Sequence, residues 1–156
     1  MKLIVRQQFK WMRGRKGWYL NAVGAPRGGL FLGAIYSNTC GFWTNLTDPG
    51  ITWRDCSTVT DGKHYIETAL NLPANGWHEF EQEFAWITED CAGGRAYLEP
   101  KGGAHVGYFI AQVWNRAPGN FKWEIFENLT GSKTIYEGRA TTLRDGQRRV
   151  EVLLNG

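Results

Sequence analysis

An all-β fold is predicted: an antiparallel β-sandwich of jelly-roll type, or a barrel, with about nine or ten strands and little or no helix. Several short segments alternate apolar and polar residues, which is the pattern of half-buried strands. Twenty glycines and an aromatic content of 14% suit short strands joined by tight turns. No convincing amphipathic helix is visible, and no repeat with a period of about 20–50 residues. Residues 1–156 are therefore expected to form a single domain.

The first half of the chain predicts three strands and then an irregular segment. Residues 2–11 alternate apolar with polar side chains, and residues 18–23 return after a basic turn. Residues 30–37 are apolar enough for a buried strand. Residues 38–62 contain Asp-Pro-Gly and Asp-Gly turn sequences. We expect these residues to form a long, aromatic-bearing loop that either binds a partner or packs on the edge of the sandwich.

The second half alternates more regularly. Residues 77–87 place Phe and Trp on one strand face and three glutamates on the other. Residues 128–131 and the Asp-Gly pair at 145–146 are typical of hairpin turns. The strands expected in this half are residues 64–72, 77–87, 95–99, 104–115, 121–127, 133–139, 141–144 and 148–154.

Charge is distributed unevenly along the chain, although the net charge is only +3. Residues 1–47 carry seven Lys or Arg and no acid, whereas residues 48–100 carry ten acids and three bases. The fold either interleaves these segments, since sheets pair distant strands, or it makes a bipolar molecule. A bipolar molecule would dock on an oppositely charged partner or on its own copies.

The three cysteines, Cys40, Cys56 and Cys91, have no CxxC spacing, so a zinc cluster is not expected. Cys40 and Cys56 could close a small loop, or all three could be buried thiols. The N-terminus turns polar at once and no apolar stretch is long enough to cross a membrane. Without a signal peptide, we expect reduced thiols and no membrane insertion.

Three segments resemble those of jelly-roll carbohydrate-binding modules. They are the turn, Trp and alternating Phe of residues 75–84, the long strand 107–114 and the late hairpin 121–131. Similar sandwiches occur in phage virions as capsid decoration proteins, fibres and tail parts. The resemblance implies a protein that recognises a surface or a sugar.

Catalysis is not expected. Residues 54–57 and 103–107 resemble the Cys and His motifs of NlpC/P60-type peptidases, with Cys56 as nucleophile and His105 as base. In that family the cysteine opens a long apolar helix that lowers the pKa of the thiol. Here a β-branched run and a turn follow Cys56, which argues against a peptidase.

Other catalytic and metal chemistry finds little support in the pattern. The carboxylates Glu79, Glu81 and Glu83 share one strand face, as exposed acidic strands commonly do, so a glycosidase pair is not expected. The histidines are too scattered for a metal site, and no cofactor motif is present.

Two candidate binding surfaces remain. Aromatic platforms with neighbouring amides bind sugars, and aromatic faces also bind proteins. The candidate glycan or protein face consists of Tyr108, Gln112, Trp114, Trp123, Trp43 and Trp53. The alternative is that strand 107–114 is central and covered on both sides. A basic docking patch is expected at Lys10, Arg13, Arg15 and Lys16; this patch could contact nucleic acid, but the acidic middle of the chain argues against that.

The sequence therefore predicts a non-enzymatic surface-recognition protein. The first hypothesis is a structural virion component, such as a phage capsid decoration or tail protein, that forms homo-oligomers or joins a larger assembly. It would assemble in the cytoplasm and end on the virion surface. The alternative is a carbohydrate-binding module or lectin, extracellular as part of a larger secreted assembly.

Overall fold

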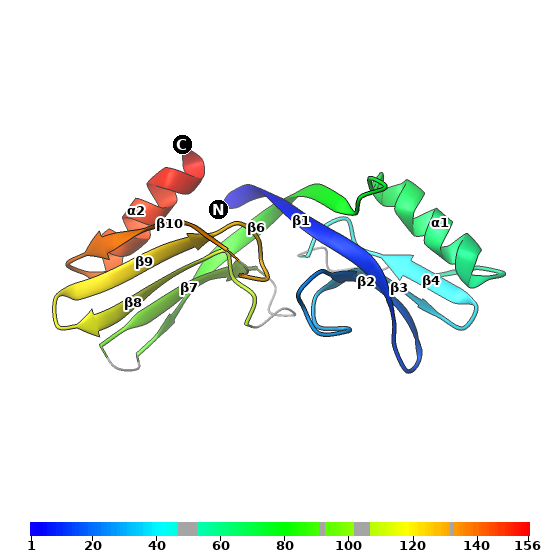
Figure 1. Cartoon of the computed structure of the whole chain (residues 1–156), viewed down its shortest axis with the longest axis horizontal. Coiled ribbons are helices and arrows are strands. Elements are labelled where there is room, and N and C mark those ends of the chain that lie inside the picture. Colours follow the sequence, from blue (N-terminus) through cyan, green and yellow to red (C-terminus); the bar gives the residue numbers. More distant parts are fainter. Residues whose placement is uncertain (47–52, 91–92, 102–106, 132) are drawn as a thin grey trace. The chain divides into compact units, whose positions relative to one another are not determined.

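The computed structural model describes residues 1–46, 53–90, 93–101, 107–131 and 133–156. These residues divide into two compact units (Figure 1). The amino-terminal unit comprises Ile4–Gln82, and the carboxy-terminal unit comprises Met1–Leu3 with Glu83–Gly156. No helix in the described part of the chain is long and apolar enough to cross a membrane.

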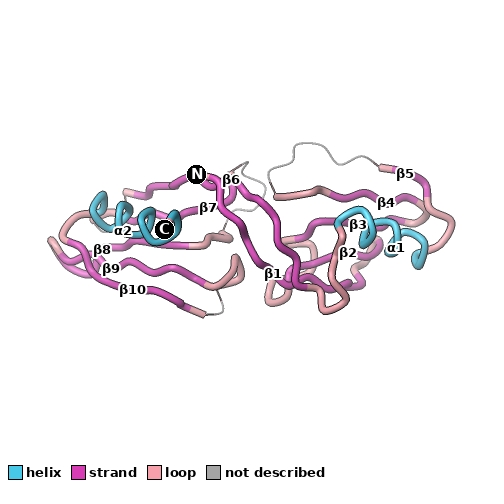
Figure 2. Tube along the Cα trace, turned by 90° about the horizontal axis from the view of Figure 1, so that it is seen from above, coloured by secondary structure: helices cyan, strands magenta, loops and turns pink. Residues whose placement is uncertain are grey.

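The amino-terminal unit is an antiparallel meander followed by a helix. Its elements are β1 (Lys2–Arg13), β2 (Gly17–Ala22), β3 (Phe31–Tyr36), β4 (Thr39–Phe42), β5 (Arg54–Asp55) and α1 (Val59–Leu70). Each strand pairs with the next along the chain. The helix α1 packs on β3 and β4, as Figure 2 shows from the helix side. Its buried side chains Ile66 and Leu70 close the core against Leu20 and Ile35 of the sheet.

The carboxy-terminal unit has the same order of elements. They are β6 (Trp77–Glu89), whose first residues Trp77–Gln82 belong to the amino-terminal unit, β7 (Arg95–Pro100), β8 (Ala111–Ala117), β9 (Asn120–Phe126), β10 (Thr134–Ala140) and α2 (Leu143–Asn155). Consecutive strands again pair antiparallel, and α2 packs mainly on β8 and β9. The strands are hydrogen-bonded in the order β10-β9-β8-β7-β6-β1-β2-β3-β4-β5. The antiparallel β class and the number of strands are thus confirmed, whereas this meander order does not confirm a jelly-roll.

The common order of elements reflects a repeat in the sequence. The motif Gln-x-Phe-x-Trp opens both meanders, at residues 7–11 and 82–86. A Tyr-Leu pair follows in β2 and in β7, and an Asn-Leu-Thr triplet occurs at residues 45–47 and again at 128–130. The motif Thr-x-x-Asp-Gly opens both helices, at residues 58–62 and 142–146. The repeat was not predicted, because its period is longer than the range of about 20–50 residues typical of solenoid repeats.

The repeated residues make equivalent contacts in the two units. The indole Nε1 of Trp11 donates to Glu67 Oε1 at 2.7 Å, and that of Trp86 donates to Glu151 Oε1 at 2.9 Å. Each hydrogen bond ties the first strand of its meander to its helix. The threonine hydroxyls at the two N-caps accept from the backbone N–H three residues on, at 3.1 and 3.0 Å. The sequence repeat is therefore also a repeat of tertiary contacts.

Both helices replace strands that were predicted. Residues 64–72 and 148–154 were expected to be strands, and 145–146 a hairpin turn; these predictions are wrong. Ile66 and Leu70 fit alternation, but they are also four residues apart and so lie on one helical face. The N-cap threonines favour a helix, because each hydroxyl accepts a hydrogen bond from a backbone N–H of the first turn that has no partner within the helix.

The segment predicted to be irregular is more ordered than expected. Residues 38–62 contain β4, β5 and the first turn of α1. Cys40 and Cys56 are both free thiols, whereas Cys91 lies outside the described residues. The Cys56 N–H donates to Asn38 O at 2.7 Å, so residues 54–56 lie beside β4 just before α1 begins.

Candidate recognition surface

One face of the amino-terminal sheet is not covered by its helix. A Cβ built on Gly33 would meet Ile66 of α1 at 3.0 Å, and Ile35 contacts Gly62 of α1, so residues 33 and 35 point toward the helix. Side chains alternate along a strand, so Ala34 and Tyr36 point to the opposite face. Tyr19 is paired with Ala34 and shares that face. We call this the helix-free face.

Five aromatic side chains form a continuous cluster there, which we call the aromatic platform: Tyr19, Phe31, Tyr36, Trp43 and Trp53. The ring centroids of Tyr19 lie 5.1 Å from Phe31 and 5.8 Å from Tyr36. Phe31 lies 5.2 Å from Trp43, and Tyr36 lies 5.4 Å from Trp53. Four of the rings are half-buried and Trp53 is 43% exposed. The platform therefore presents accessible aromatic surface on a rigid sheet.

Backbone glycines and a hydroxyl pair hold Tyr19 in place. A Cβ at Gly14 would lie 2.6 Å from Tyr19 Cε2, so only glycine allows the β1–β2 hairpin to approach this ring. The Tyr36 hydroxyl donates to the Tyr19 hydroxyl at 3.2 Å. Burial, and secondarily the hydrogen bond and the charge of Tyr19, raise the pKa of Tyr36 to about 12. Tyr36 therefore keeps its proton at neutral pH.

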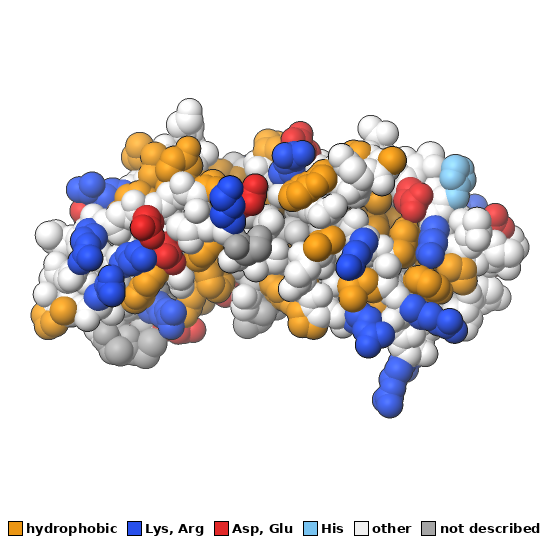
Figure 3. Space-filling model, viewed as in Figure 1, with side chains coloured by type: hydrophobic (Ala, Val, Ile, Leu, Met, Phe, Trp, Pro, Cys, Tyr) orange, Lys and Arg blue, Asp and Glu red, His pale blue; other side chains and the backbone are white. Residues whose placement is uncertain are grey.

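Basic side chains lie on the strands and loops that carry Tyr19, and Figure 3 shows several Lys and Arg side chains over the half of the molecule that holds β1–β4. Lys10 is paired with Asn21 on the helix-free face, and Arg15 and Lys16 lie in the β1–β2 hairpin. Arg27 is held next to the platform because its Nη1 donates to Arg13 O at 2.8 Å. All four side chains are exposed, and none forms a salt bridge with a carboxylate of the described residues. Their charge is available to a ligand.

The equivalent face of the carboxy-terminal unit differs in its charge balance. Tyr97, Phe109 and Phe126 repeat the ring contacts of Tyr19, Phe31 and Trp43 at 4.8 and 5.7 Å. Lys122 on this face is paired with Glu124 at 3.2 Å and Glu137 at 3.1 Å. These two glutamates raise the pKa of Lys122. On the second face Lys122 is thus paired with two carboxylates, beside the further basic residues Arg95 and Arg139, whereas the first face has no such ion pair among the described residues.

The predicted ligand face is divided between the two units. Trp43 and Trp53 belong to the aromatic platform, whereas Gln112 and Trp114 lie on the helix-free face of the carboxy-terminal sheet. Gln112 donates to Glu124 at 3.0 Å, and Lys122 lies over the Trp114 ring. Trp123 alternates to the helix side, packs against Gly138 and is only 8% exposed, so it does not lie on the face of Gln112 and Trp114. Tyr108 is half-buried.

The basic patch and the platform have members that sequence reasoning missed. Arg13 is paired with Trp18, which points to the helix side, so Arg13 is not on the helix-free face with Lys10. Arg27 was not predicted in the patch. Tyr19 and Tyr36 were not predicted in the platform, because residues 18–23 were interpreted only as a strand and residues 30–37 as a buried strand. Alternation alone does not tell which face a helix covers.

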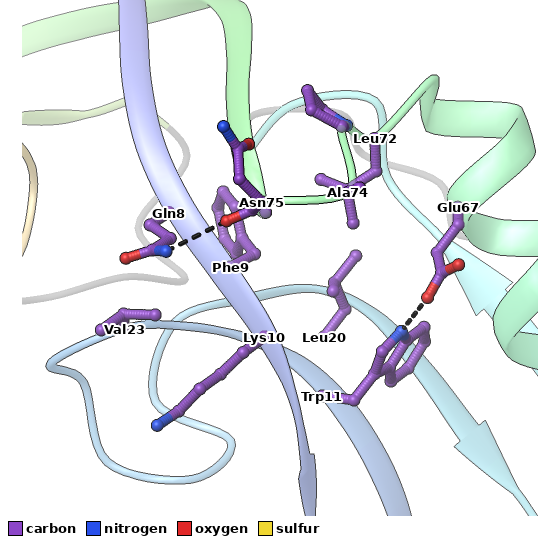
Figure 4. A pocket seen from close by; sticks show the side chains of 12 residues that line it. Gln8, Phe9, Lys10, Trp11, Leu20, Val23, Glu67, Leu72, Ala74 and Asn75 are labelled. Carbon is purple, nitrogen blue, oxygen red and sulfur yellow. Dashed lines mark hydrogen bonds between the residues drawn. The ribbon is translucent and has the colours of Figure 1, made fainter.

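A cavity of about 510 Å³ also lies in the amino-terminal unit, beside β1 (Figure 4). The turn at residues 72–76 and the end of α1 complete its wall. Gln8 Nε2 donates to Asn75 O at 3.0 Å, and Glu67, the only acid in the lining, accepts from Trp11. The single carboxylate is already engaged, so the cavity offers no acid–base pair for catalysis.

The argument against a peptidase, that no helix follows Cys56, does not hold. A helix does follow Cys56, because α1 begins at Val59, so the prediction of a turn there was wrong. The expected base, His105, lies outside the described residues. Burial, and secondarily a hydrogen bond with the neighbouring Cys56 thiol, raise the pKa of the Cys40 thiol to about 11. Cys40 is therefore protonated and unreactive at neutral pH.

The other candidate catalytic groups are exposed, ion-paired or buried. Glu79 and Glu81 are exposed, whereas Glu83 is paired with Lys101 at 3.0 Å, which lowers the pKa of Glu83. His78 is buried and stacks on Phe80, and burial lowers its pKa. In the part of the chain that the structure describes, no three His, Cys, Asp or Glu side chains gather to hold a metal.

No family model, curated protein or solved structure matches the chain.

Proposed function

We propose that this chain is a non-enzymatic recognition protein that binds its partner through the aromatic platform. The observation that carries the proposal is the cluster of five rings in continuous contact on a sheet face that α1 leaves open. Such rings bind by stacking on flat or apolar ligand faces, and they lose little entropy because the sheet holds them. Glycans, proteins and nucleic acids all offer such faces.

Exposure of Trp53 allows a direct test. Trp53→Ala removes the most exposed ring of the platform, and we expect it to weaken binding about tenfold for any ligand that stacks there. Tyr136→Ala is the matched control, because Tyr136 is 54% exposed on β10 of the other unit. The ligands to be tested are a glycan array, single-stranded oligonucleotides and heparin. Affinity is measured for each, and chromatography of the recovered ligand shows whether it has been cleaved or modified.

Two outcomes would contradict the proposal. One is a ligand that binds both variants and the wild type equally well, which would place its site away from the platform. The other is a ligand recovered in cleaved or modified form, which would make the protein an enzyme.

A second candidate function is assembly with further copies, as the virion hypothesis requires. Strand β10 ends the strand order, and its residues Ile135 and Tyr136 are 44% and 54% exposed. Val152 and Leu153 of α2 are also exposed, at 70% and 43%. An uncovered edge strand with apolar side chains is a surface on which a second copy can pair.

Light scattering tests this second candidate. At about 50 µM, a concentration that saturates a micromolar self-association, we expect dimers or larger oligomers. Ile135→Lys should shift them to monomers, because it places a charge on the edge strand. A wild-type chain that is monomeric at this concentration would rule out self-assembly through β10.

A further inference from the structure

We infer that the ligand of the aromatic platform is single-stranded nucleic acid, with unpaired bases stacked on the rings and phosphates held by Lys10, Arg15, Lys16 and Arg27. This inference rests on the proposed function, because it uses the same surface. Proteins that bind single strands combine aromatic rings for the bases with a basic track for the backbone.

The comparison of the two repeats points to an anionic ligand. Both helix-free faces carry an equivalent trio of rings. On the carboxy-terminal face Glu124 and Glu137 lie among the cations and pair with Lys122, one of three basic residues there beside Arg95 and Arg139. The cations beside Tyr19 have no such carboxylates in the described structure. Four exposed positive charges around uncharged rings attract a polyanion and leave its aromatic groups in contact with the platform.

The amide next to Tyr19 on this face is not free to bind a sugar, which leaves Asp55 as the carboxylate beside the rings among the described residues. Sugar sites need amides or carboxylates beside the rings to bind hydroxyl groups. The amide of Asn21 is fully buried: its Nδ2 donates to Ala22 O, Ala25 O and Pro26 O, and its Oδ1 accepts from Gly28 N at 2.9 Å. Asn21 instead fixes the loop that carries Arg27.

The acidic middle of the chain does not oppose a ligand on this surface. Of its acids in this unit, Asp61 and Glu67 lie on α1, on the other side of the sheet. Glu79 and Glu81 lie on β6, with β1 between that strand and β2. Asp55, paired with Thr39 next to Tyr36, is the carboxylate that borders the platform among the described residues. The expectation against nucleic acid rested on position in the sequence, which the fold does not preserve.

The test uses the full chain and fluorescence anisotropy with labelled oligothymidylate and oligouridylate of about 15 nucleotides. We expect micromolar affinity, about 1–100 µM at low salt, for both. A duplex of equal length should bind at least about tenfold more weakly, because its bases cannot stack on protein rings. Heparin should compete only weakly on an equal-charge basis, since it has no bases.

Two sets of variants separate the roles of charge and rings. The triple variant Lys10→Glu, Arg15→Glu, Lys16→Glu should bind more than about tenfold more weakly and flatten the salt dependence by about two in the log–log slope. Its control reverses three exposed charges of the other unit: Arg116→Glu, Lys133→Glu and Arg148→Glu. Both proteins have the same net charge, so only the position differs. Trp53→Ala should weaken binding about tenfold and Trp53→Phe should restore most of it.

Each outcome is decisive once circular dichroism shows that the variants are folded. Equal affinity for single strand, duplex and heparin, or equal losses in the two triple variants, would overturn the inference in favour of unspecific charge attraction. Absence of oligonucleotide binding together with glycan binding that depends on Trp53 would overturn it and leave the proposed function intact. Oligonucleotide binding that ignores Trp53 would overturn both.

Discussion

Replacing Gly76 by alanine is expected to lower the free energy of unfolding by about 3 kcal/mol, a large part of the stability of an ordinary domain. Gly76 has a φ of +78°, and a Cβ built on it would lie 2.3 Å from Phe9 O. That oxygen belongs to the backbone of β1, so it cannot rotate away as a side chain can. The turn must instead move from β1 and lose the hydrogen bond from Phe9 N to Gly76 O, 2.9 Å long.

Gly28 supplies the matched control in the same unit. Its φ of +73° is almost the same, but a Cβ there would meet only Tyr19 ring atoms, at 3.8 and 3.9 Å. Gly28→Ala should therefore cost only the backbone strain of about 1 kcal/mol. Urea denaturation followed by tryptophan fluorescence measures both. Equal losses of stability in the two variants would show that β1 moves to accommodate the Cβ, and that the positive φ alone sets the cost at these glycines.

The strands were predictable because their alternation is local. Residues 2–11 and 77–87 alternate over ten or more positions, and β1 and β6 occupy Lys2–Arg13 and Trp77–Glu89. The helices were missed because Ile66 and Leu70 satisfy a period of two and a spacing of four equally well. The signal that separates the two was present: Thr58 and Thr142 each stand three residues before an Asp, as N-caps do.

The aromatic platform was predictable only in part. Trp43 and Trp53, two of its rings, were predicted to be accessible because aromatic residues in an irregular segment have no strand partner to bury them. Tyr36 was assigned to a buried strand, and Trp123 to a binding face, because alternation defines two faces without showing which one a helix covers. Recognition of the Thr-x-x-Asp-Gly repeat would have supplied both helices, and with them the covered face of each sheet.

The same repeat predicts opposite effects for equivalent glycines in the two helices. Alanine is about 1 kcal/mol more favourable than glycine inside a helix, so Gly62→Ala and Gly146→Ala should gain the same helix propensity. At Gly62 the added Cβ meets only side-chain atoms at 3.0 Å or more: Ile35 Cδ1 at 3.0 Å, Cys56 Sγ at 3.2 Å and Ile35 Cγ1 at 3.3 Å, so a shift of a few tenths of an ångström relieves the contacts. At Gly146 it meets Val113 Cγ1 at 2.6 Å, and a buried valine on a strand has no other rotamer to adopt without strain.

We therefore expect Gly62→Ala to be neutral or stabilising and Gly146→Ala to lower the free energy of unfolding by about 1–2 kcal/mol, as measured by urea denaturation. The Val113→Ala background tests the cause. Val113→Ala is itself destabilising, but it removes both γ-methyls, so adding Gly146→Ala to it should restore stability rather than reduce it further. A loss of the same size in both backgrounds would mean that Gly146 is required for a reason other than the close approach of α2 to β8.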